Sequence, residues 1–201
     1  MDHVFSRRDV IKAAAAAGAV LPAFSIPSVS AKPTGKVFKV ALIGCGGRGN
    51  GALKNCMDAA KHLGVTIRTV AVADVFADRV GKTAESYGVP PERVFVGFSG
   101  YKDVMETEAD IVLLATPPNF RPVHLEAAVN AGKHVFMEKP VAVDPPGARR
   151  VIAAGEMAAK KGLGIVAGTQ RRHQAAYRRN AHAIANGAIG QIVGGTVLWC
   201  S

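Results

Sequence analysis

The chain has 201 residues with 49% hydrophobic content, which is enough for one α/β core and a smaller additional segment. A formal net charge of +10 is typical of nucleic-acid-binding proteins, but only 6% of the residues are aromatic and few of these lie among the basic residues, so no surface for stacking bases and no nucleic-acid partner is predicted. From residue 139 to residue 179, nine Lys or Arg residues accompany two acids, a bias that suits solvated helix faces or the attraction of acidic and phosphorylated small molecules.

The first 31 residues have the pattern of an export signal. Arg7 and Arg8 precede an uncharged, Ala-rich stretch over residues 13–31, which ends in small residues. This pattern predicts a bacterial twin-arginine signal peptide, and with it a periplasmic or otherwise exported protein that uses the twin-arginine translocase. Pro22 and Pro27 interrupt the weakly apolar run, which argues against a stable membrane span. An uncleaved anchor and a chance amphipathic start are the alternatives.

After the signal, apolar segments of strand length alternate with segments of helical pattern. Strands are predicted at 37–43, 65–73, 93–96, 111–115, 134–137 and 163–167, and helices at 48–62, 77–87, 101–106, 120–131 and 146–161. The strands are nearly continuous in Val, Ile, Leu and Ala, as expected when helices cover both faces of a sheet. The alternation predicts an α/β fold with a doubly wound parallel sheet over residues 36–168.

The last part of the chain reads as the start of another domain. A helix is predicted at 175–186 and a strand at 192–200. A lone Val/Leu/Trp strand would present an unpaired apolar edge. We therefore expect residues 169–201 to begin a C-terminal α+β domain for substrate binding and oligomerisation, truncated in this sequence.

The three cysteines do not predict a metal site or a disulfide framework. Cys45, Cys56 and Cys200 are odd in number and lack the spacing of metal ligands. We expect them to be small buried hydrophobic residues, and we expect no metal.

The glycine-rich segment 44–49 fits the pattern G-x-G-x-x-G where a strand ends and a helix begins, which is the context that a dinucleotide site requires. Gly44 permits the tight turn, Gly46 lets the backbone approach a pyrophosphate, and Gly49 lets the helix pack close to the strand. Backbone N–H groups at the helix start bind the phosphates. We predict a dinucleotide-binding Rossmann domain over 36–168, with these six residues as cofactor contacts: Gly44, Cys45, Gly46, Gly47, Arg48 and Gly49. A purely structural turn is the alternative.

Asp74, at the end of the second predicted strand, bears on the choice of cofactor. An acid at this place accepts hydrogen bonds from both ribose hydroxyls and repels a 2′-phosphate, which favours NAD over NADP. Arg79 lies one turn into the next helix and could reach such a phosphate. Alternatively, Asp74 caps that helix.

Two further strand ends should flank the nicotinamide. Ligands of open α/β sheets bind outside the carboxyl ends of strands where the strand order reverses. The fourth strand ends before Thr116, Pro117 and Asn119, and the fifth ends before Glu138 and Lys139. Pro140 biases Lys139 toward an extended backbone, so we expect the strand to continue and the ammonium group to project into the cleft.

Together these segments resemble the glucose–fructose oxidoreductase/inositol dehydrogenase/rhizopine-catabolism (Gfo/Idh/MocA) family of oxidoreductases. The resemblance rests on the glycine pattern, on Asp74, on residues 116–119, and on Gly-Lys-His-Val running into Glu-Lys-Pro at 132–140. It covers nearly all of the chain after residue 36, and some members share the export signal.

This resemblance implies a hydride transfer between a sugar or polyol carbon and a nicotinamide. It implies that Lys139 is the catalytic residue that hydrogen-bonds the reacting oxygen and helps its proton transfer, and that Glu138 orients the ring or Lys139. Gln170 and Arg171 belong to the segment that lines the nicotinamide or sugar site. In such families the second catalytic group, usually a histidine, comes from the larger C-terminal domain, and the full-length proteins form homo-oligomers.

Two other functions stay open. One is a glycosidase that uses tightly held NAD for transient oxidation and elimination, although glycosidases on this scaffold often depart from Glu-Lys-Pro. The other is a non-catalytic nucleotide-binding protein, because a fold does not by itself determine function.

Overall fold

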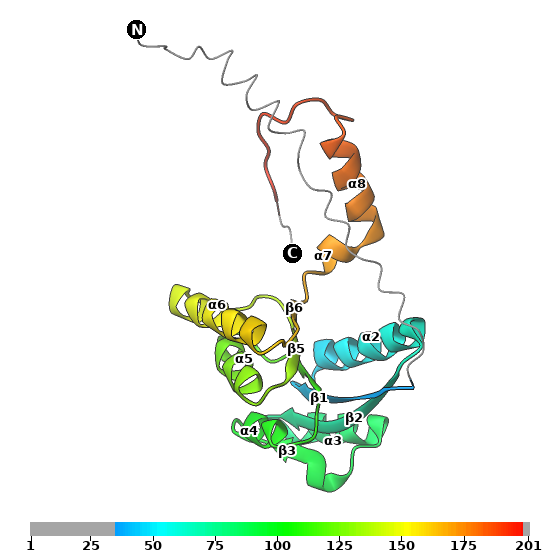
Figure 1. Cartoon of the computed structure of the whole chain (residues 1–201), viewed down its shortest axis with the longest axis vertical. Helices are drawn as coiled ribbons and strands as arrows, with labels where there is room; N and C mark the ends of the chain where they lie inside the picture. The colour runs from blue at the N-terminus through cyan, green and yellow to red at the C-terminus, as the bar shows by residue number, and fades with distance from the viewer. Residues whose placement is uncertain (1–34, 199–201) are drawn as a thin grey trace. The chain divides into compact units, whose positions relative to one another are not determined.

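The computed structural model describes residues 35–198, and within them six parallel strands form one sheet in the order β3-β2-β1-β4-β5-β6 (Figure 1). The strands are β1 (Val37–Ile43), β2 (Thr66–Asp74), β3 (Val94–Val96), β4 (Ile111–Leu114), β5 (His134–Met137) and β6 (Ile165–Ala167). The predicted doubly wound parallel sheet is therefore confirmed, with strand limits within two residues of those expected.

The helices alternate with the strands as predicted. They are α2 (Gly47–Leu63), α3 (Ala77–Tyr87), α4 (Gly100–Met105), α5 (Arg121–Asn130) and α6 (Pro145–Lys160). Local signals explain several of their limits. Helix α2 ends at Gly64, which adopts the left-handed conformation that glycine tolerates best. Helix α6 begins after Asp144, whose side chain accepts a hydrogen bond from the Gly147 amide.

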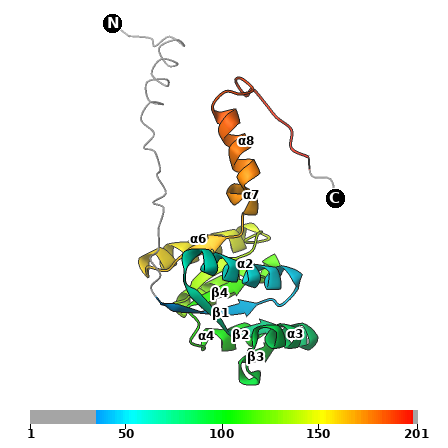
Figure 2. The ribbon, with the colours of Figure 1, turned by 90° about the vertical axis from the view of Figure 1, so that its right-hand side faces the viewer.

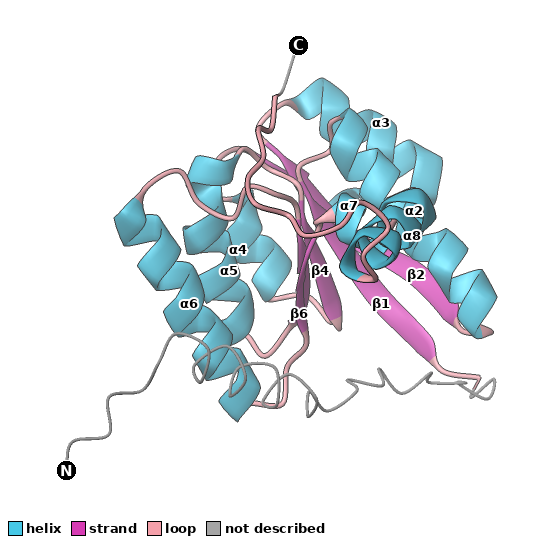
Figure 3. Ribbon diagram, turned by 90° about the horizontal axis from the view of Figure 1, so that it is seen from above, coloured by secondary structure: helices cyan, strands magenta, loops and turns pink. Residues whose placement is uncertain are grey.

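The sheet has a hydrophobic core on each face, because successive side chains of a strand point to opposite faces. In β1, Val40 and Leu42 pack with α2 and α3, whereas Ala41 and Ile43 pack with α4, α5 and α6. Figure 3 shows the corresponding layers, with α2 and α3 on one side of the sheet and α4, α5 and α6 on the other. Figure 2 shows α3 beside β3, at one edge of the sheet.

The strand order reverses between β1 and β4, and this reversal places the site. The chain runs outward from β1 through β2 to β3, returns to pair β4 with the other side of β1, and then runs outward again to β6. All pairings are parallel, so the carboxyl ends of β1, β2, β4 and β5 lie at the same edge. The segments that were predicted to bind the cofactor follow these four ends, except for Gln170 and Arg171, which follow β6.

The segment after β6 differs from the sequence prediction in one respect. Helices α7 (Gln170–His173) and α8 (Ala175–Ala185) are present, and α8 agrees with the predicted helix at 175–186. The strand predicted at 192–200 is wrong over residues 192–198, which have no strand structure and leave Val193 and Val197 almost fully exposed. A strand exists only through pairing with a neighbour, and no described strand pairs with this segment.

Some predictions fall outside the described residues. These are the signal peptide, Cys200 and the last residues of the predicted strand. Within residues 35–198, none of the helices combines the length and the apolar character that crossing a lipid bilayer requires.

Candidate functional site

The turn between β1 and α2 requires glycine at two positions. Gly44 has φ +98°, and a Cβ there would come within 2.7 Å of the Ala115 and Thr116 backbone. A Cβ on Gly49 would lie 1.7 Å from the Gly44 carbonyl oxygen. The turn is also tied to β2, because the Gly44 amide donates to the Ala73 carbonyl over 2.8 Å. The predicted roles of Gly44 in the tight turn and of Gly49 in close packing therefore agree with the geometry.

Gly46 differs from these two glycines because its surroundings are open. It is the N-cap of α2, with φ −73° and ψ −175°, and no atom lies within 4 Å of the place where its Cβ would be. The first turn of α2 holds no acidic residue and no side chain caps it. The positive end of the helix dipole and its first amide groups therefore face an open space that fits a phosphate group.

Asp74 is fixed by the backbone around it. Its Oδ2 accepts a hydrogen bond from the Cys45 amide (2.6 Å), and its Oδ1 accepts one from the Phe76 amide (2.9 Å). The N-cap residue of α3 is Phe76, and no side chain caps this helix. Asp74 therefore binds the amide of the N-cap residue and is not the cap itself. The carboxylate thus ties the end of β2 to the glycine turn.

A cavity of about 450 Å³ opens beside the turn and Asp74, at the ends of β1, β2 and β4. Its volume lies in the range of small-molecule sites. The Arg79 guanidinium stacks over the Phe76 ring in its wall, with 4.5 Å between the Cζ atom and the ring centroid. The lining includes Gly44, Gly46, Asp74, Phe76, Arg79, Phe98, Tyr101, Thr116, Pro117, Phe120 and His124.

At the end of β4, two buried polar residues hold the loop that contains Thr116. Arg121 is 1% exposed, and its guanidinium donates to the Leu114 carbonyl and, over 2.8 Å, to the Thr116 carbonyl. His124 Nδ1 lies 3.3 Å from the Thr116 hydroxyl. Burial, and then the positive charge of Arg121, lower the pKa of His124 from 6.5 to about 4. The imidazole is therefore neutral at pH 7.

At the end of β5, Glu138 and Lys139 face different surroundings. Glu138 is 8% exposed, and its Oε1 lies 2.7 Å from Nε of Arg48 at the start of α2. Lys139 is exposed in a bend and forms a cis peptide bond with Pro140. The expected extension of the strand to Lys139 is wrong: β5 ends at Met137, where the Glu138 amide still pairs with Leu114 of β4 (2.9 Å) before the chain bends away.

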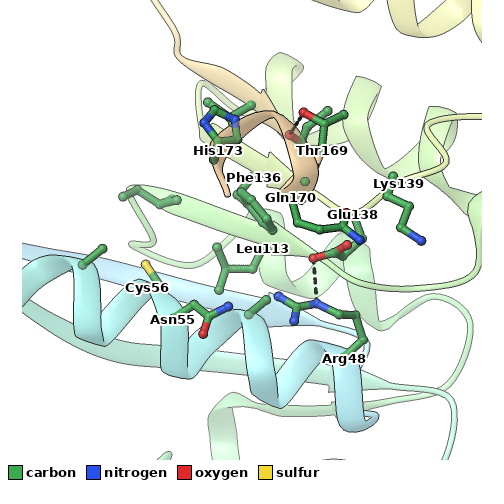
Figure 4. A pocket seen from close by; sticks show the side chains of 16 residues that line it. Arg48, Asn55, Cys56, Leu113, Phe136, Glu138, Lys139, Thr169, Gln170 and His173 are labelled. Carbon is green, nitrogen blue, oxygen red and sulfur yellow. Dashed lines mark hydrogen bonds and ion pairs between the residues drawn. The ribbon is translucent and has the colours of Figure 1, made fainter. Parts of the chain in front are cut away.

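A second cavity, of about 580 Å³, lies between α2 and the face of β4, β5 and β6 (Figure 4). Arg48, Glu138, Lys139, Gln170 and His173 line it together with apolar side chains of the sheet. Lys139 therefore lines the same cavity as a residue of the glycine turn, on the carboxyl edge that both segments share. Gly46, Asp74 and Thr116 line the other cavity, so the joint role of the glycine turn and Lys139 stays a prediction.

The structure brings most of the predicted site residues to these two cavities. Cys45 and Gly47 lie in a neighbouring polar hollow with Arg79 and Lys82. Burial raises the pKa of the Cys45 thiol to about 12, so its side chain is a neutral thiol at pH 7. The Cys45 backbone amide donates a hydrogen bond to the Asp74 carboxylate. Their roles in cofactor binding stay predictions.

Three predicted residues line none of these cavities. Gly49 is buried at the start of α2, against the glycine turn. Asn119 is exposed in the short 3-10 turn η3 (Pro118–Phe120) and lines neither cavity. Arg171 is exposed and stacks on Tyr177, 5.4 Å from its ring centroid.

The sequence-based predictions above do not include Arg121 or His124. One signal in the sequence could have identified both residues. Arg121 and His124 lie on the helical stripe of Leu125, Ala128 and Val129, and all five residues are buried. A polar residue on a buried stripe needs a polar partner, which here is the end of β4.

Comparisons with known proteins agree with this geometry. A family model described as "Oxidoreductase family, NAD-binding Rossmann fold" matches residues 38–169. The chain is 29% identical over 155 residues to an inositol 2-dehydrogenase of Salmonella paratyphi B, covering 77% of this chain and 43% of that protein. It therefore spans less than half the length of the curated relatives that it matches.

Solved structures show the same relationship. The scyllo-inositol dehydrogenase of Lactobacillus casei with bound NAD(H) and scyllo-inositol matches with a TM-score of 0.63 and 27% identity, over 77% of this chain and 43% of that one. A 3-ketoreductase from Actinomadura kijaniata in complex with TDP-benzene and NADP matches with a TM-score of 0.60 and 26% identity, over 78% and 46%.

Proposed function

Because this chain belongs to the Gfo/Idh/MocA oxidoreductase family, we propose that the protein is an NAD(P)-dependent oxidoreductase that transfers a hydride between the nicotinamide and a sugar, polyol or related carbohydrate. The observation that carries this proposal is the glycine turn, where Gly44 and Gly49 exclude a Cβ and Gly46 leaves open space before the start of α2. Of the related proteins named above, two are inositol dehydrogenases and one is a 3-ketoreductase.

The cofactor would be held along the carboxyl edge of the sheet. The amides at the start of α2 suit its phosphates, and the cavity beside Asp74 suits the adenosine. Thr116 and Pro117 line the same cavity from the β4 side.

NAD is the preferred form in this proposal. The Asp74 carboxylate is held in the cavity wall by two amides, so its negative charge stays where it would repel a 2′-phosphate. Arg79 lines the same cavity, and its positive charge would attract a 2′-phosphate, which limits the preference for NAD over NADP.

When bound, the nicotinamide supplies the hydride acceptor or donor. Lys139 is exposed to the cavity shared with Arg48, so its ammonium group can donate a hydrogen bond to a substrate oxygen and exchange a proton with it. A longer protein that forms a homo-oligomer is part of this proposal, and residues outside the given sequence would then complete the substrate site.

Replacing Lys139 tests this role. In the full-length protein, Lys139→Met should lower kcat by about 100-fold or more, since general acid–base groups contribute at least that much, while leaving the dissociation constant of NADH within a factor of two. Lys160→Met, at an exposed position on α6, is the matched control. Unchanged turnover in Lys139→Met would contradict the role of Lys139, and release of an aryl leaving group without net NADH formation would identify the glycosidase instead.

The proposal includes export through the twin-arginine translocase, supported by Arg7, Arg8 and the uncharged stretch that follows them. Replacing both arginines by lysine should trap the precursor in the cytoplasm, as measured by cell fractionation. Undiminished export of that variant would contradict the signal.

A further inference from the structure

We infer that the carbohydrate on which the proposed reaction acts carries an acidic group, a carboxylate or a phosphate, and that Arg171 and Arg172 of α7 bind this group. The inference rests on the proposed function, because it names the substrate class of the same site. It concerns the charge around the cavity of about 580 Å³ that Lys139 lines.

The positive charge of the folded part of the chain is concentrated after β5. Residues 36–138 hold 12 Lys or Arg and 11 Asp or Glu, so most of the Rossmann domain is nearly neutral. Residues 139–201 hold nine Lys or Arg and two acids, the second of which is Glu156. Every charged side chain that follows Glu156 is therefore a cation.

Helix α7 brings part of this charge to the cavity. It begins two residues after the end of β6, and its first and last residues, Gln170 and His173, line the cavity together with Lys139. Arg171 and Arg172 are the two residues between them, and both are exposed. Their guanidinium groups therefore belong to the rim of the cavity that Lys139 lines.

The acid that lines this cavity does not offset the positive charge. The carboxylate of Glu138 is already paired, since its Oε1 lies 2.7 Å from Nε of Arg48 (Figure 4). Within residues 35–198, no acid forms an ion pair with Lys139 or Arg172. The charge that remains at the cavity is positive, and it attracts anions.

The charge of α7 lies too far from the adenosine end of the site to serve a 2′-phosphate. The cavity beside Asp74 opens at the ends of β1, β2 and β4, whereas α7 follows β6. In the order β3-β2-β1-β4-β5-β6, four strand spacings separate β6 from β2, which amounts to about 19 Å. An anion bound at α7 is therefore part of the substrate and not of the adenosine.

Two neighbouring guanidinium groups suit an acidic carbohydrate better than a neutral one. Guanidinium groups form charge-assisted, often bidentate hydrogen bonds with carboxylates and phosphates. A neutral sugar offers only hydroxyl groups. In this inference Lys139 binds the reacting oxygen and α7 binds the acidic group, so the substrate is held at two places. Such holding orients the carbon that exchanges the hydride.

Binding to the full-length protein, measured by titration calorimetry, tests the inference without requiring turnover. The probes are D-glucuronate, D-galacturonate and D-glucose 6-phosphate, each compared with its neutral parent sugar. At least one of them should have a dissociation constant at least about tenfold below that of its parent at low salt. The difference should shrink at about 0.5 M salt, because ions screen exposed charges. If no acidic probe binds more tightly than its parent, the inference is overturned.

A double variant assigns the effect to α7. Arg171→Gln/Arg172→Gln changes only exposed side chains, so the core should be unaffected. KM for the acidic substrate should rise at least about fivefold, while kcat and the KM for the neutral parent change less than about twofold. The control Arg149→Gln/Lys160→Gln removes two charges from exposed positions on α6, on the other face of the sheet. Equal effects of the two double variants would overturn the assignment to α7.

Failure of the proposed function would give a different result. A protein that binds the acidic probes more tightly than their parents, but forms no NADH from any carbohydrate, would support the anion site and contradict the proposed oxidoreductase. A protein that oxidises neutral carbohydrates and discriminates against their acids would support the proposed function and overturn this inference.

Discussion

The glycine turn and the ends of β4 and β5 lie at the same edge of the sheet but are held in different ways. In the turn, backbone sterics decide the structure: Gly44 has a positive φ, and Gly49 admits no Cβ. At the ends of β4 and β5, hydrogen bonds and an ion pair of charged and polar side chains fix the structure. These side chains are Arg121, Glu138 and His124. The first region should therefore respond to side-chain size and the second to charge and pH.

The largest effect should come from Gly49→Ala. The added Cβ would lie 1.7 Å from the Gly44 carbonyl oxygen, so either α2 or the turn must move. We expect the free energy of unfolding to fall by at least about 4 kcal/mol, measured by chemical denaturation.

Gly81→Ala on α3 is the matched control for this variant. A Cβ there meets no atom within 4 Å, so the helix should gain about 0.5 to 1 kcal/mol from the better helix former. If Gly49→Ala is as stable as the parent, sterics do not fix the turn.

The second effect should be a pH dependence that originates at the end of β4. The pKa of His124 is about 4 in the folded protein and near 6.5 in the unfolded chain, so between these values the unfolded chain binds more protons. Stability contributed by the neutral imidazole should therefore be lost as the pH falls from about 6.5 to 4, by up to about 3 kcal/mol.

The variant His124→Gln isolates this contribution from that of the carboxylates, which also titrate at low pH. Its unfolding free energy should fall less steeply than that of the parent over this pH range. Parallel curves for the two proteins would show that His124 does not contribute.

A smaller effect is expected from Asp74→Asn, which changes charge within the backbone-held region. The amide keeps one acceptor oxygen but has no negative charge to repel a 2′-phosphate. The ratio of the dissociation constants of NADPH and NADH should fall about tenfold, or 1.4 kcal/mol, by fluorescence titration. Equal affinities of the parent for both cofactors would reject the assignment of Asp74.

The two regions also differed in how far the sequence predicted them. The glycine turn was predictable because its determinants are consecutive residues between a strand and a helix. The contacts of Arg121, Glu138 and Arg48 join residues up to 90 positions apart, and each residue type alone is most often exposed. The helical stripe on α5 was the one local signal for Arg121 and His124.

The same distinction explains the outcome for the end of the chain. Helix α8 was predicted nearly to its limits because its hydrogen bonds are internal. The predicted strand at 192–200 depended on a partner elsewhere, and an apolar run does not identify one. Local patterns therefore predicted helices and turns better than pairings.

The most direct test of the cofactor site is Gly46→Ala, measured by NADH fluorescence titration beside thermal unfolding. Its φ and ψ suit alanine and the added Cβ meets no atom within 4 Å, so the unfolding temperature should stay that of the parent. The Cβ would nevertheless occupy the space where a pyrophosphate approaches the backbone, so NADH affinity should fall at least about tenfold. A folded Gly46→Ala protein that binds NADH as tightly as the parent would contradict a cofactor site at this turn.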